Sequence, residues 1–208
     1  SPFKAEERII EYLLKSANGS KLVNMSLAAF ADETASESPA PGGGSIAAYV
    51  GSLGISLATM VANLSSHKKG WDERWELYSA WAEKGQMLKD QLMKLVDADT
   101  AAFNKIMIAL GLPKATDDEK KIRNNAIQEA TKFAIEVPFR VMQLSFDSME
   151  IIRAMAEQGN PNSVSDAGVG ALCARSAVMG AFMNVRINAA GYHDQEFVKY
   201  IVAEGRNI

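Results

Sequence analysis

The stretch Ser45–Leu64, with the sequence SIAAYVGSLGISLATMVANL, contains no charged residue over twenty consecutive positions, which is the length of a membrane span. Its composition argues for another role. Ala, Gly, Ser and Thr outnumber Leu and Ile, and polar side chains follow one side of the expected helix. We interpret the stretch as a helix that other helices of the protein bury, with a lone membrane span as the minor alternative.

The helical period continues along the rest of the chain, and no segment shows a convincing strand pattern. Only six prolines occur, and most of them fall where helices are expected to begin or end. Pro138 is an exception, because it lies inside an expected helix and is predicted to kink or break it. The expected helices cover residues 4–15, 26–35, 45–66, 72–110, 116–158, 163–190 and 194–204.

Serines mark the start of two of these helices. Ser26 is the expected N-cap of the helix over residues 26–35, and Ser163 or Ser165 is expected to cap the second apolar helix. The segment 36–44 is expected to be a loop. Together these patterns predict an all-α, single-domain helical bundle over residues 1–208 with two central apolar helices. Two such helices are hard to cover within one chain, so a homodimer is predicted as well.

Composition and charge exclude several classes of partner. The net charge is −3 and the basic residues are spread along the chain, so no nucleic-acid partner is expected. A single cysteine, Cys173, rules out an intrachain disulfide and favours a reducing compartment. The segment Ser1–Ser20 carries charges throughout and lacks an apolar core, so no signal peptide is expected. These features predict a cytoplasmic protein without a membrane partner.

Asp99 is the charged residue whose position is hardest to explain by solvation. On a helix its neighbours belong to an apolar stripe, which makes an ionised carboxylate costly unless it is paired or has a functional opening. Burial also raises a carboxyl pKa toward the range that is useful for proton transfer. The alternative is a structural aspartate bonded to a helix end or to an arginine such as Arg175. The apolar neighbours are Leu92, Leu95, Val96, Ala102, Phe103 and Ile106.

Two polar loops precede the apolar helices. In the first, Pro39–Ser45 with the sequence PAPGGGS, the glycines allow the backbone to approach a ligand and a helix with free N–H groups follows. In the second, Gly159–Asp166 with the sequence GNPNSVSD, capping explains the serines and the aspartate but not the two asparagines. Taken singly, the first loop is better explained as a tight connection between packed helices, and the alternative for the second loop is ordinary helix capping.

Several polar residues lie inside the apolar helices, among them Asn63, Asn184 and Asn188. Asn184 and Asn188 are one turn apart and share a face, so their amides need partners from the core, the backbone or a ligand. No His, Cys or Glu spacing matches a zinc site, and no pairing of His67 or His193 with a serine or Cys173 indicates an activated nucleophile. Metal and covalent catalysis are therefore not expected, and His67-Lys68-Lys69 is either a solvated turn or a contact for an anionic tail.

Five segments, in this order, resemble the cyclodeaminase/cyclohydrolase family, whose fold also forms the C-terminal domain of formiminotransferase-cyclodeaminase. The resemblance covers most of the chain, from about Phe3 to Phe197, and the stretch His67–Gly70 departs from the family pattern. It implies an all-helical dimer with a folate-binding cleft at or near the dimer interface. The segments are Pro39–Ser45, Met60–Leu64, Val96–Phe103, Gly159–Asn160 with Ser165–Asp166, and Asn184–Asn188.

The resemblance also implies roles for individual residues. Asp99 corresponds to the catalytic aspartate of the family, in agreement with the argument from its apolar neighbours. The substrate is a tetrahydrofolate derivative, with no tightly bound cofactor and no metal. The residues expected to bind the substrate are Pro41, Gly42, Gly43, Gly44, Ser45, Asn63, Asn160, Ser165, Asp166 and Asn188.

The resemblance leaves two reactions open. The first is conversion of 5-formiminotetrahydrofolate to 5,10-methenyltetrahydrofolate with release of ammonia, with Asp99 as the proton-transferring group. The second is hydrolysis of the methenyl group to 10-formyltetrahydrofolate, and no residue separates the two. A helical dimer that binds folate or serves as a scaffold without catalysis is the alternative from another class. The retained Asp99 and the two polar loops argue against it.

Overall fold

The computed structural model describes residues 21–208, so the helix predicted over residues 4–15 lies outside the described range. Residues 21–208 are mainly helical and contain no strand, which confirms the all-α prediction. The chain divides into two compact units, one ending at Pro41 and the other covering Gly42–Ile208. The prediction of one domain over residues 1–208 stays a prediction.

The described part of the first unit contains a short 3-10 turn, Leu22–Asn24, and helix α3, Leu27–Ala35. The hydroxyl of Ser26 accepts a hydrogen bond from the backbone N–H of Ala29 at 3.1 Å. This bond satisfies one of the N–H groups that the first helical turn leaves without a partner. The prediction of Ser26 as an N-cap is therefore confirmed.

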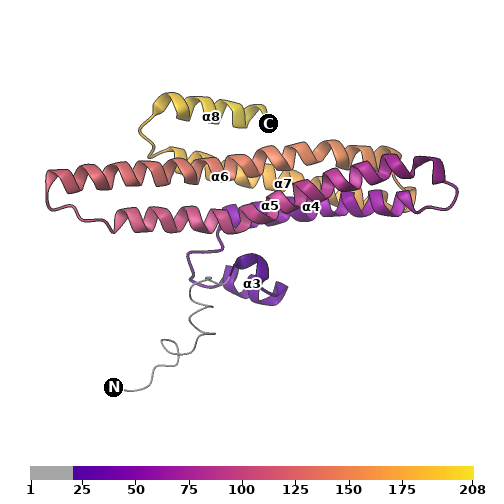
Figure 1. The fold of residues 1–208 in the computed structure, drawn as a ribbon, viewed down its shortest axis with the longest axis horizontal. Helices are drawn as coiled ribbons and strands as arrows, with labels where there is room; N and C mark the ends of the chain where they lie inside the picture. The colour runs from indigo at the N-terminus through magenta and orange to yellow at the C-terminus, as the bar shows by residue number, and fades with distance from the viewer. Residues whose placement is uncertain (1–20) are drawn as a thin grey trace, which may run out of the picture. The chain divides into compact units, whose positions relative to one another are not determined.

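The second unit contains four long helices that run alongside one another, and a shorter helix, α8 (Gln195–Asn207), that contacts α6 and α7 (Figure 1). Two short 3-10 turns, Asp72–Arg74 and Pro161–Ser163, lead into α5 and α7. A capping box at Thr116 and Glu119 begins α6. The long helices are α4 (Gly43–Ser66), α5 (Trp75–Leu110), α6 (Asp117–Gln158) and α7 (Val164–Ala189).

Helix α4 lies antiparallel to both α5 and α7. Its contact with α7 is close: a Cβ atom on Gly54 would lie 2.8 Å from the carbonyl oxygen of Gly170, and a Cβ on Gly170 would lie equally near the carbonyl of Gly54. Because real Cβ atoms do not approach a carbonyl this closely, both positions need glycine for the backbones to pack. The two glycines fix how α4 and α7 pass each other.

The two apolar helices differ in how far the chain covers them. Both α4 and the segment Pro161–Ala189 are long and apolar enough to cross a membrane. In the most apolar part of α4, 61% of the residues are buried inside the protein, as expected for a central helix, whereas the corresponding share for the segment that contains α7 is 28%. Among residues 21–208, α4 is therefore a central helix as predicted, whereas no other described element covers the outer face of α7, so within one chain α7 is not central.

Some predicted boundaries also need correction. Pro138 was predicted to kink or break its helix, and it does not break it, because α6 continues through this buried residue. A proline cannot donate to the carbonyl four residues earlier. That carbonyl, on Ala134, instead accepts a hydrogen bond of 2.7 Å from Nδ2 of Asn188 on α7. A side chain from the neighbouring helix thus replaces the missing backbone donor.

Helix α4 begins at Gly43, so Gly43 and Gly44 form its first turn and not the end of the predicted loop. Helix α7 begins after the 3-10 turn without a side-chain cap from Ser163, and Ser165 already lies inside the helix. The expected serine cap is absent because the backbone N–H of Val164 bonds to the carbonyl of Pro161, which carries the turn directly into the helix. The predicted start of α5 was Asp72, which belongs instead to the preceding 3-10 turn.

Candidate active site

Asp99 lies on α5 beside the N-terminal end of α4. Its Oδ2 atom is 3.0 Å from the hydroxyl oxygen of Ser45, which also lies 3.1 Å from the carbonyl oxygen of Val96. Ser45 and Val96 are buried, and Asp99 is partly buried. The single hydroxyl proton of Ser45 is therefore shared between the carboxylate and a backbone carbonyl.

The surroundings of Asp99 shift the pKa of its carboxyl group. Desolvation by burial raises the pKa of its carboxyl above the ordinary aspartate value, and hydrogen bonds from the side chain and backbone of Ser45 offset part of this rise. The N-terminal end of α4 also favours the charged form, because its backbone N–H groups carry partial positive charge. A carboxyl held in this balance is suited to exchanging a proton with a ligand.

Gly44 is what allows the carboxylate to approach α4. A Cβ atom at this position would overlap the carboxylate of Asp99, whose Oδ1, Cγ and Oδ2 atoms are the nearest neighbours of that site. A Cβ on Gly43 would meet only the amide of Asn184, at 3.5 Å, which is an ordinary contact. The two glycines were both predicted to let the backbone approach a ligand. Gly44 instead makes room for the Asp99 side chain, whereas the space beside Gly43 is not filled in this way.

The position of Asp99 agrees with both interpretations of its sequence context. It bonds at a helix end, as the structural alternative proposed, although its partner is Ser45 and not the exposed Arg175. Its pKa is nonetheless raised, so these contacts do not fully compensate the burial of the charge. Helices α5 and α6 pack on each other next to this site. The contact is made by the buried side chains of Ala102, Ala134 and Val137, surrounded by Leu95, Ala98, Ile106 and Phe133.

Helix α7 brings two asparagines to the same end of the bundle. Nδ2 of Asn184 donates to the carbonyl of Gly180 at 3.0 Å, and the side chain lies beside Gly43. Asn188, one turn later, bonds to Ala134 as described above. The substrate contact predicted for Asn188 stays a prediction beside this structural role. Asn184 was not among the predicted site residues, although its spacing from Asn188 indicated a shared face.

Three of the predicted substrate residues, Asn160, Ser165 and Asp166, lie at the other end of α4. The backbone N–H of Asn160 donates to the hydroxyl of Ser65 at 2.8 Å. Ser65 is twenty residues after Ser45 on the same helix, which corresponds to about 30 Å along the axis. Ser165 and Asp166 follow in the first turn of α7, where Ser165 is exposed and Asp166 is partly buried. Within one chain, none of these three residues lies near Asp99.

Three further predicted residues are placed as follows. Gly42 is the N-cap residue of α4, where its backbone is extended and makes no side-chain cap. Pro41 ends the first unit, is buried and follows a cis peptide bond from Ala40. Asn63 is exposed and lines a cavity of about 450 Å³ between α4 and α5.

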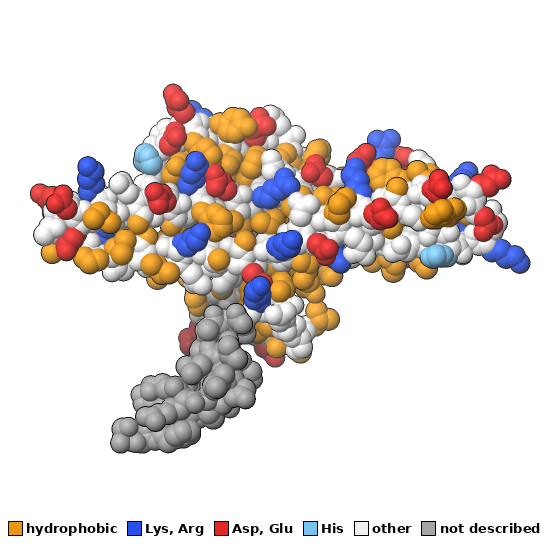
Figure 2. All heavy atoms as spheres, in the orientation of Figure 1, with side chains coloured by type: hydrophobic (Ala, Val, Ile, Leu, Met, Phe, Trp, Pro, Cys, Tyr) orange, Lys and Arg blue, Asp and Glu red, His pale blue; other side chains and the backbone are white. Residues whose placement is uncertain are grey.

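Neither the surface charge seen in Figure 2 nor the described side chains indicate a nucleic-acid site or a metal site. Acidic and basic side chains are interspersed over the face shown in Figure 2, with no extended basic patch on it. Among residues 21–208, no group of three or more His, Cys, Asp or Glu side chains could hold a metal ion. In the described part of the chain, Asp99 is a carboxyl group whose pKa is raised by burial.

Comparison with known proteins identifies relatives of this arrangement. Residues 26–207 match the family model described as formiminotransferase-cyclodeaminase. A methenyltetrahydrofolate cyclohydrolase from Methylorubrum extorquens is 39% identical over 85% of this chain and 85% of its own. A formimidoyltransferase-cyclodeaminase from Gallus gallus is 37% identical over 95% of this chain, which spans 37% of the length of that relative. The crystal structure of a formiminotetrahydrofolate cyclodeaminase from Thermotoga maritima superposes with a TM-score of 0.76 and 29% identity, covering 88% of this chain and 89% of that one.

Proposed function

Since the chain belongs to the formiminotransferase-cyclodeaminase family, we propose that it converts 5-formiminotetrahydrofolate to 5,10-methenyltetrahydrofolate and ammonia. The observation that carries the proposal is the partly buried carboxyl of Asp99, held by Ser45 at the end of α4 with a raised pKa. A group of this kind can take up a proton and return it within one catalytic cycle.

The reaction needs two proton transfers at neighbouring nitrogens. The formimino group reacts in its protonated form, N5–CH=NH2+. N10 attacks its carbon and forms the second C–N bond, which turns the iminium nitrogen into an amino group, and N10 loses its proton to the Asp99 carboxylate. The amino group then accepts this proton and leaves as ammonia, and the positive charge stays on the methenyl bridge. The ionised carboxylate, next to this cation, stabilises the positive charge that develops. The hydroxyl of Ser45 keeps the carboxylate oriented between these steps.

Hydrolysis of the methenyl group is the second candidate, and the Methylorubrum extorquens cyclohydrolase favours it, because this chain covers 85% of that relative. In this reaction the Asp99 carboxylate takes a proton from water as the water oxygen attacks the methenyl carbon. Asp99 then returns this proton to N5 as the C–N5 bond breaks, and the hydroxyl proton passes to solvent as the formyl C=O forms, which gives 10-formyltetrahydrofolate. Both reactions use the same carboxyl group and share the methenyl compound.

The absorbance of the methenyl compound distinguishes the two reactions. Appearance of the chromophore from 5-formiminotetrahydrofolate, with stoichiometric ammonia, supports the cyclodeaminase, and accelerated loss of the chromophore without deamination supports the cyclohydrolase. Asp99→Asn keeps the shape of the side chain and is expected to lower kcat by at least about 100-fold in either reaction. If the wild-type protein binds tetrahydrofolate but accelerates neither reaction, the non-catalytic binding protein becomes the better description.

We also infer that two copies of the chain assemble, because α7 presents an uncovered apolar face. Met179, Met183 and Ile187 lie four residues apart on this face, and their exposed fractions are 51%, 65% and 72%. The neighbouring α4 adds exposed leucine and methionine side chains, such as Leu53 and Met60. A second copy of the same surface is the simplest partner for exposed apolar side chains on two neighbouring helices.

A dimer also explains why the predicted substrate residues lie at two ends of α4. If the partner's α4 runs in the opposite direction across the interface, its loop with Asn160, Ser165 and Asp166 lies near Asp99 of the first copy. Each of two equivalent sites then contains Asp99 and the residues from Gly42 to Ser45 of one chain, with the second polar loop of the other. Cytoplasmic location and the lack of a bound cofactor are part of the same proposal.

Mixed dimers test this arrangement. Asp99→Asn and Asn160→Ala proteins, each of low activity, are unfolded together and refolded in equal amounts. Half of the dimers are then mixed and each has one intact site if the two residues come from different chains, so about a quarter of the wild-type activity returns. No recovery contradicts a site that two chains share.

Light scattering tests the interface separately. Met183→Glu is expected to give monomers, whereas Met87→Glu, at a site of similar exposure on α5, serves as the matched control. A wild-type protein that is soluble and monomeric contradicts the dimer. One that stays soluble only in detergent supports a membrane contact instead.

A further inference from the structure

The loop that joins α6 to α7 is attached to two other helices by buried hydroxyl groups. Ser65, on the last turn of α4, is fully buried, and its hydroxyl donates to the carbonyl of Val61 at 2.6 Å and accepts from the backbone N–H of Asn160 at 2.8 Å. Tyr78, on α5, is equally buried, and its hydroxyl donates to the carbonyl of Gln158 at 2.5 Å. The start of the loop is therefore held by α4 and by α5 at the same time.

The same bonds leave one group of Asn160 available to a ligand. Its backbone carbonyl accepts from the N–H of Ser163 at 2.8 Å, and its Oδ1 atom accepts from the N–H of Asn162 at 3.2 Å. Nδ2 of Asn160 makes no hydrogen bond with residues 21–208, and the residue is partly exposed. Because Oδ1 is held, the amide has a fixed orientation, and Nδ2 presents its donors to an acceptor outside the chain.

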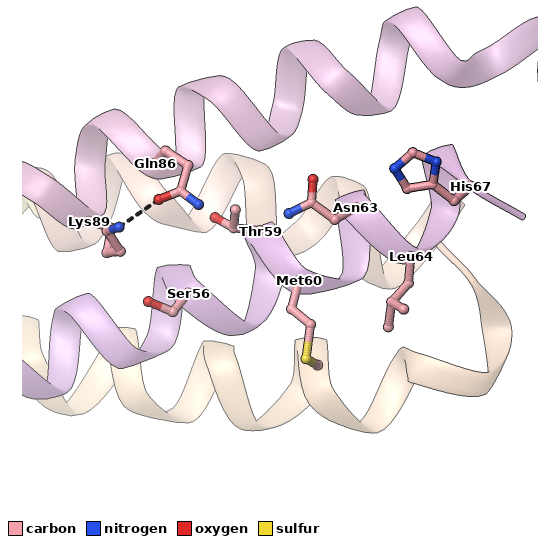
Figure 3. A pocket seen from close by; sticks show the side chains of 8 residues that line it. All are labelled: Ser56, Thr59, Met60, Asn63, Leu64, His67, Gln86 and Lys89. Carbon is pink, nitrogen blue, oxygen red and sulfur yellow. Dashed lines mark hydrogen bonds between the residues drawn. The ribbon is translucent and has the colours of Figure 1, made fainter.

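Ser65 is separate from the cavity between α4 and α5. Figure 3 shows Asn63 and His67, which line that cavity, at the same end of α4. Ser65 lies between them in the sequence, about 200° around the helix axis from Asn63, and it contacts the loop instead. A substitution of Ser65 therefore alters the support of the loop without altering the lining of the cavity.

On the basis of the function and the two-chain site proposed above, we propose that Ser65 and Tyr78 are positioning residues for the active site of the partner copy. They hold the loop so that Nδ2 of Asn160 donates a hydrogen bond to an oxygen or ring nitrogen of the folate bound at Asp99 of the other chain. Within its own chain, Ser65 lies about 30 Å along α4 from Ser45, too far to act on the nearer site. Each chain thus supports a part of the site that the other chain completes.

Calorimetric binding of tetrahydrofolate tests whether Ser65 acts through Asn160. Ser65→Ala and Asn160→Ala are each expected to weaken binding about tenfold, the size of one lost hydrogen bond. The double variant is expected to bind as weakly as Asn160→Ala alone, because both substitutions remove the same contact. Tyr78→Phe, which keeps the buried ring, should weaken binding as Ser65→Ala does. Ser148→Ala is the matched control, since it also removes a fully buried hydroxyl that donates to a backbone carbonyl, but within α6, and it is expected to bind as the wild type.

Mixed dimers show which copy the positioning serves. Ser65→Ala chains are refolded with a large excess of Asp99→Asn chains, so that nearly every Ser65→Ala chain pairs with a chain whose loop is intact. The activity per Ser65→Ala chain at low substrate is then expected to rise about tenfold, to the wild-type value, although the added chains lack the catalytic carboxylate. An excess of chains that carry both substitutions is the matched control and gives no rise, because the support of their loop is also lost.

The outcomes separate this inference from the proposed function. Wild-type affinity in Ser65→Ala, or losses that multiply in the double variant with Asn160→Ala, overturn the positioning role even if the methenyl assay shows activity. No rise in the mixed dimers overturns the assignment to the partner copy. If the wild type neither binds tetrahydrofolate nor accelerates either reaction, both the positioning role and the proposed function fail. The expected pattern of affinities without turnover supports the positioning role and contradicts the catalytic proposal alone.

Discussion

The contact between Gly44 and Asp99 allows a sharp test of how the candidate site is built. In Gly44→Ala, the new Cβ occupies the space of the Asp99 carboxylate, so either the carboxylate or the start of α4 must move. Forcing an extra methyl group into a packed site costs about 1–3 kcal/mol. The better helix propensity of alanine returns at most about 1 kcal/mol. We therefore expect the free energy of unfolding to fall by about 1–2 kcal/mol.

In Gly44→Ala, kcat is expected to fall by more than the change in the free energy of unfolding alone would suggest. A displacement of about 1 Å in a catalytic group can lower a rate by about 100-fold. Urea unfolding gives the change in stability, and the methenyl absorbance assay gives kcat for whichever reaction the wild type catalyses. The loss is expected in kcat at temperatures where the variant is fully folded.

Gly43→Ala is the matched control, because it adds the same methyl group one residue earlier in the same helical turn. Its nearest neighbour would be the amide of Asn184 at 3.5 Å, so no group needs to move. This variant is expected to be as stable as the wild type, or up to about 1 kcal/mol more stable. If Gly44→Ala equals Gly43→Ala in both stability and kcat, the carboxylate is not held against α4 and the described geometry of the site is refuted.

Three further changes test the surroundings of Asp99. Ser45→Ala removes the hydrogen bond that stabilises the carboxylate, so the pKa of Asp99 rises and the pH–rate profile on its acidic side shifts to higher pH; an unshifted profile contradicts this role. The pKa of Asp99 is raised in the folded state, so ionisation of this carboxyl destabilises the fold as the pH rises through that pKa. Asp99→Asn cannot ionise and should therefore have a higher melting temperature than the wild type at neutral pH. The difference in melting temperature should shrink below about pH 4, where the wild-type carboxyl is protonated in both states. Asn188→Leu leaves the Ala134 carbonyl without its donor and is expected to cost about 1–3 kcal/mol in urea unfolding, an effect that should vanish if Pro138→Ala is introduced with it.

The helices could be predicted from the sequence because their signals are local. Apolar spacing, Gly111 and the acidic turn after Thr116 marked the ends of α5 and the start of α6 within a few residues. Asp99 was also identifiable, since a charge within an apolar stripe is visible in one helix alone. Its partner was not, because the contact with Ser45 joins residues that are 54 positions apart.

The differences from the sequence-based predictions share a physical cause. Contacts between residues far apart in the sequence override what local sequence patterns predict. Pro138 breaks a helix by local reasoning, but Asn188 supplies the missing donor from another helix. Periodicity showed that both apolar helices are hard to cover within one chain, but not that the uncovered face would be on α7. The family resemblance assigned both polar loops to one substrate site, and this stays a prediction. Since α4 and α7 run antiparallel, the two loops lie at opposite ends of the bundle within one chain, which the sequence did not indicate.

The bond between Asn188 and Ala134 has a consequence for how the sequence can change over time. As long as Pro138 is present, Asn188 is needed to complete α6, and a replacement without a donor leaves a polar group buried. If another residue takes the place of Pro138, the ordinary backbone bond returns and position 188 becomes free to vary. The order of substitutions is therefore constrained, because position 138 must change before position 188. We expect the identities of these two positions to covary across relatives of this protein, as the record of that order.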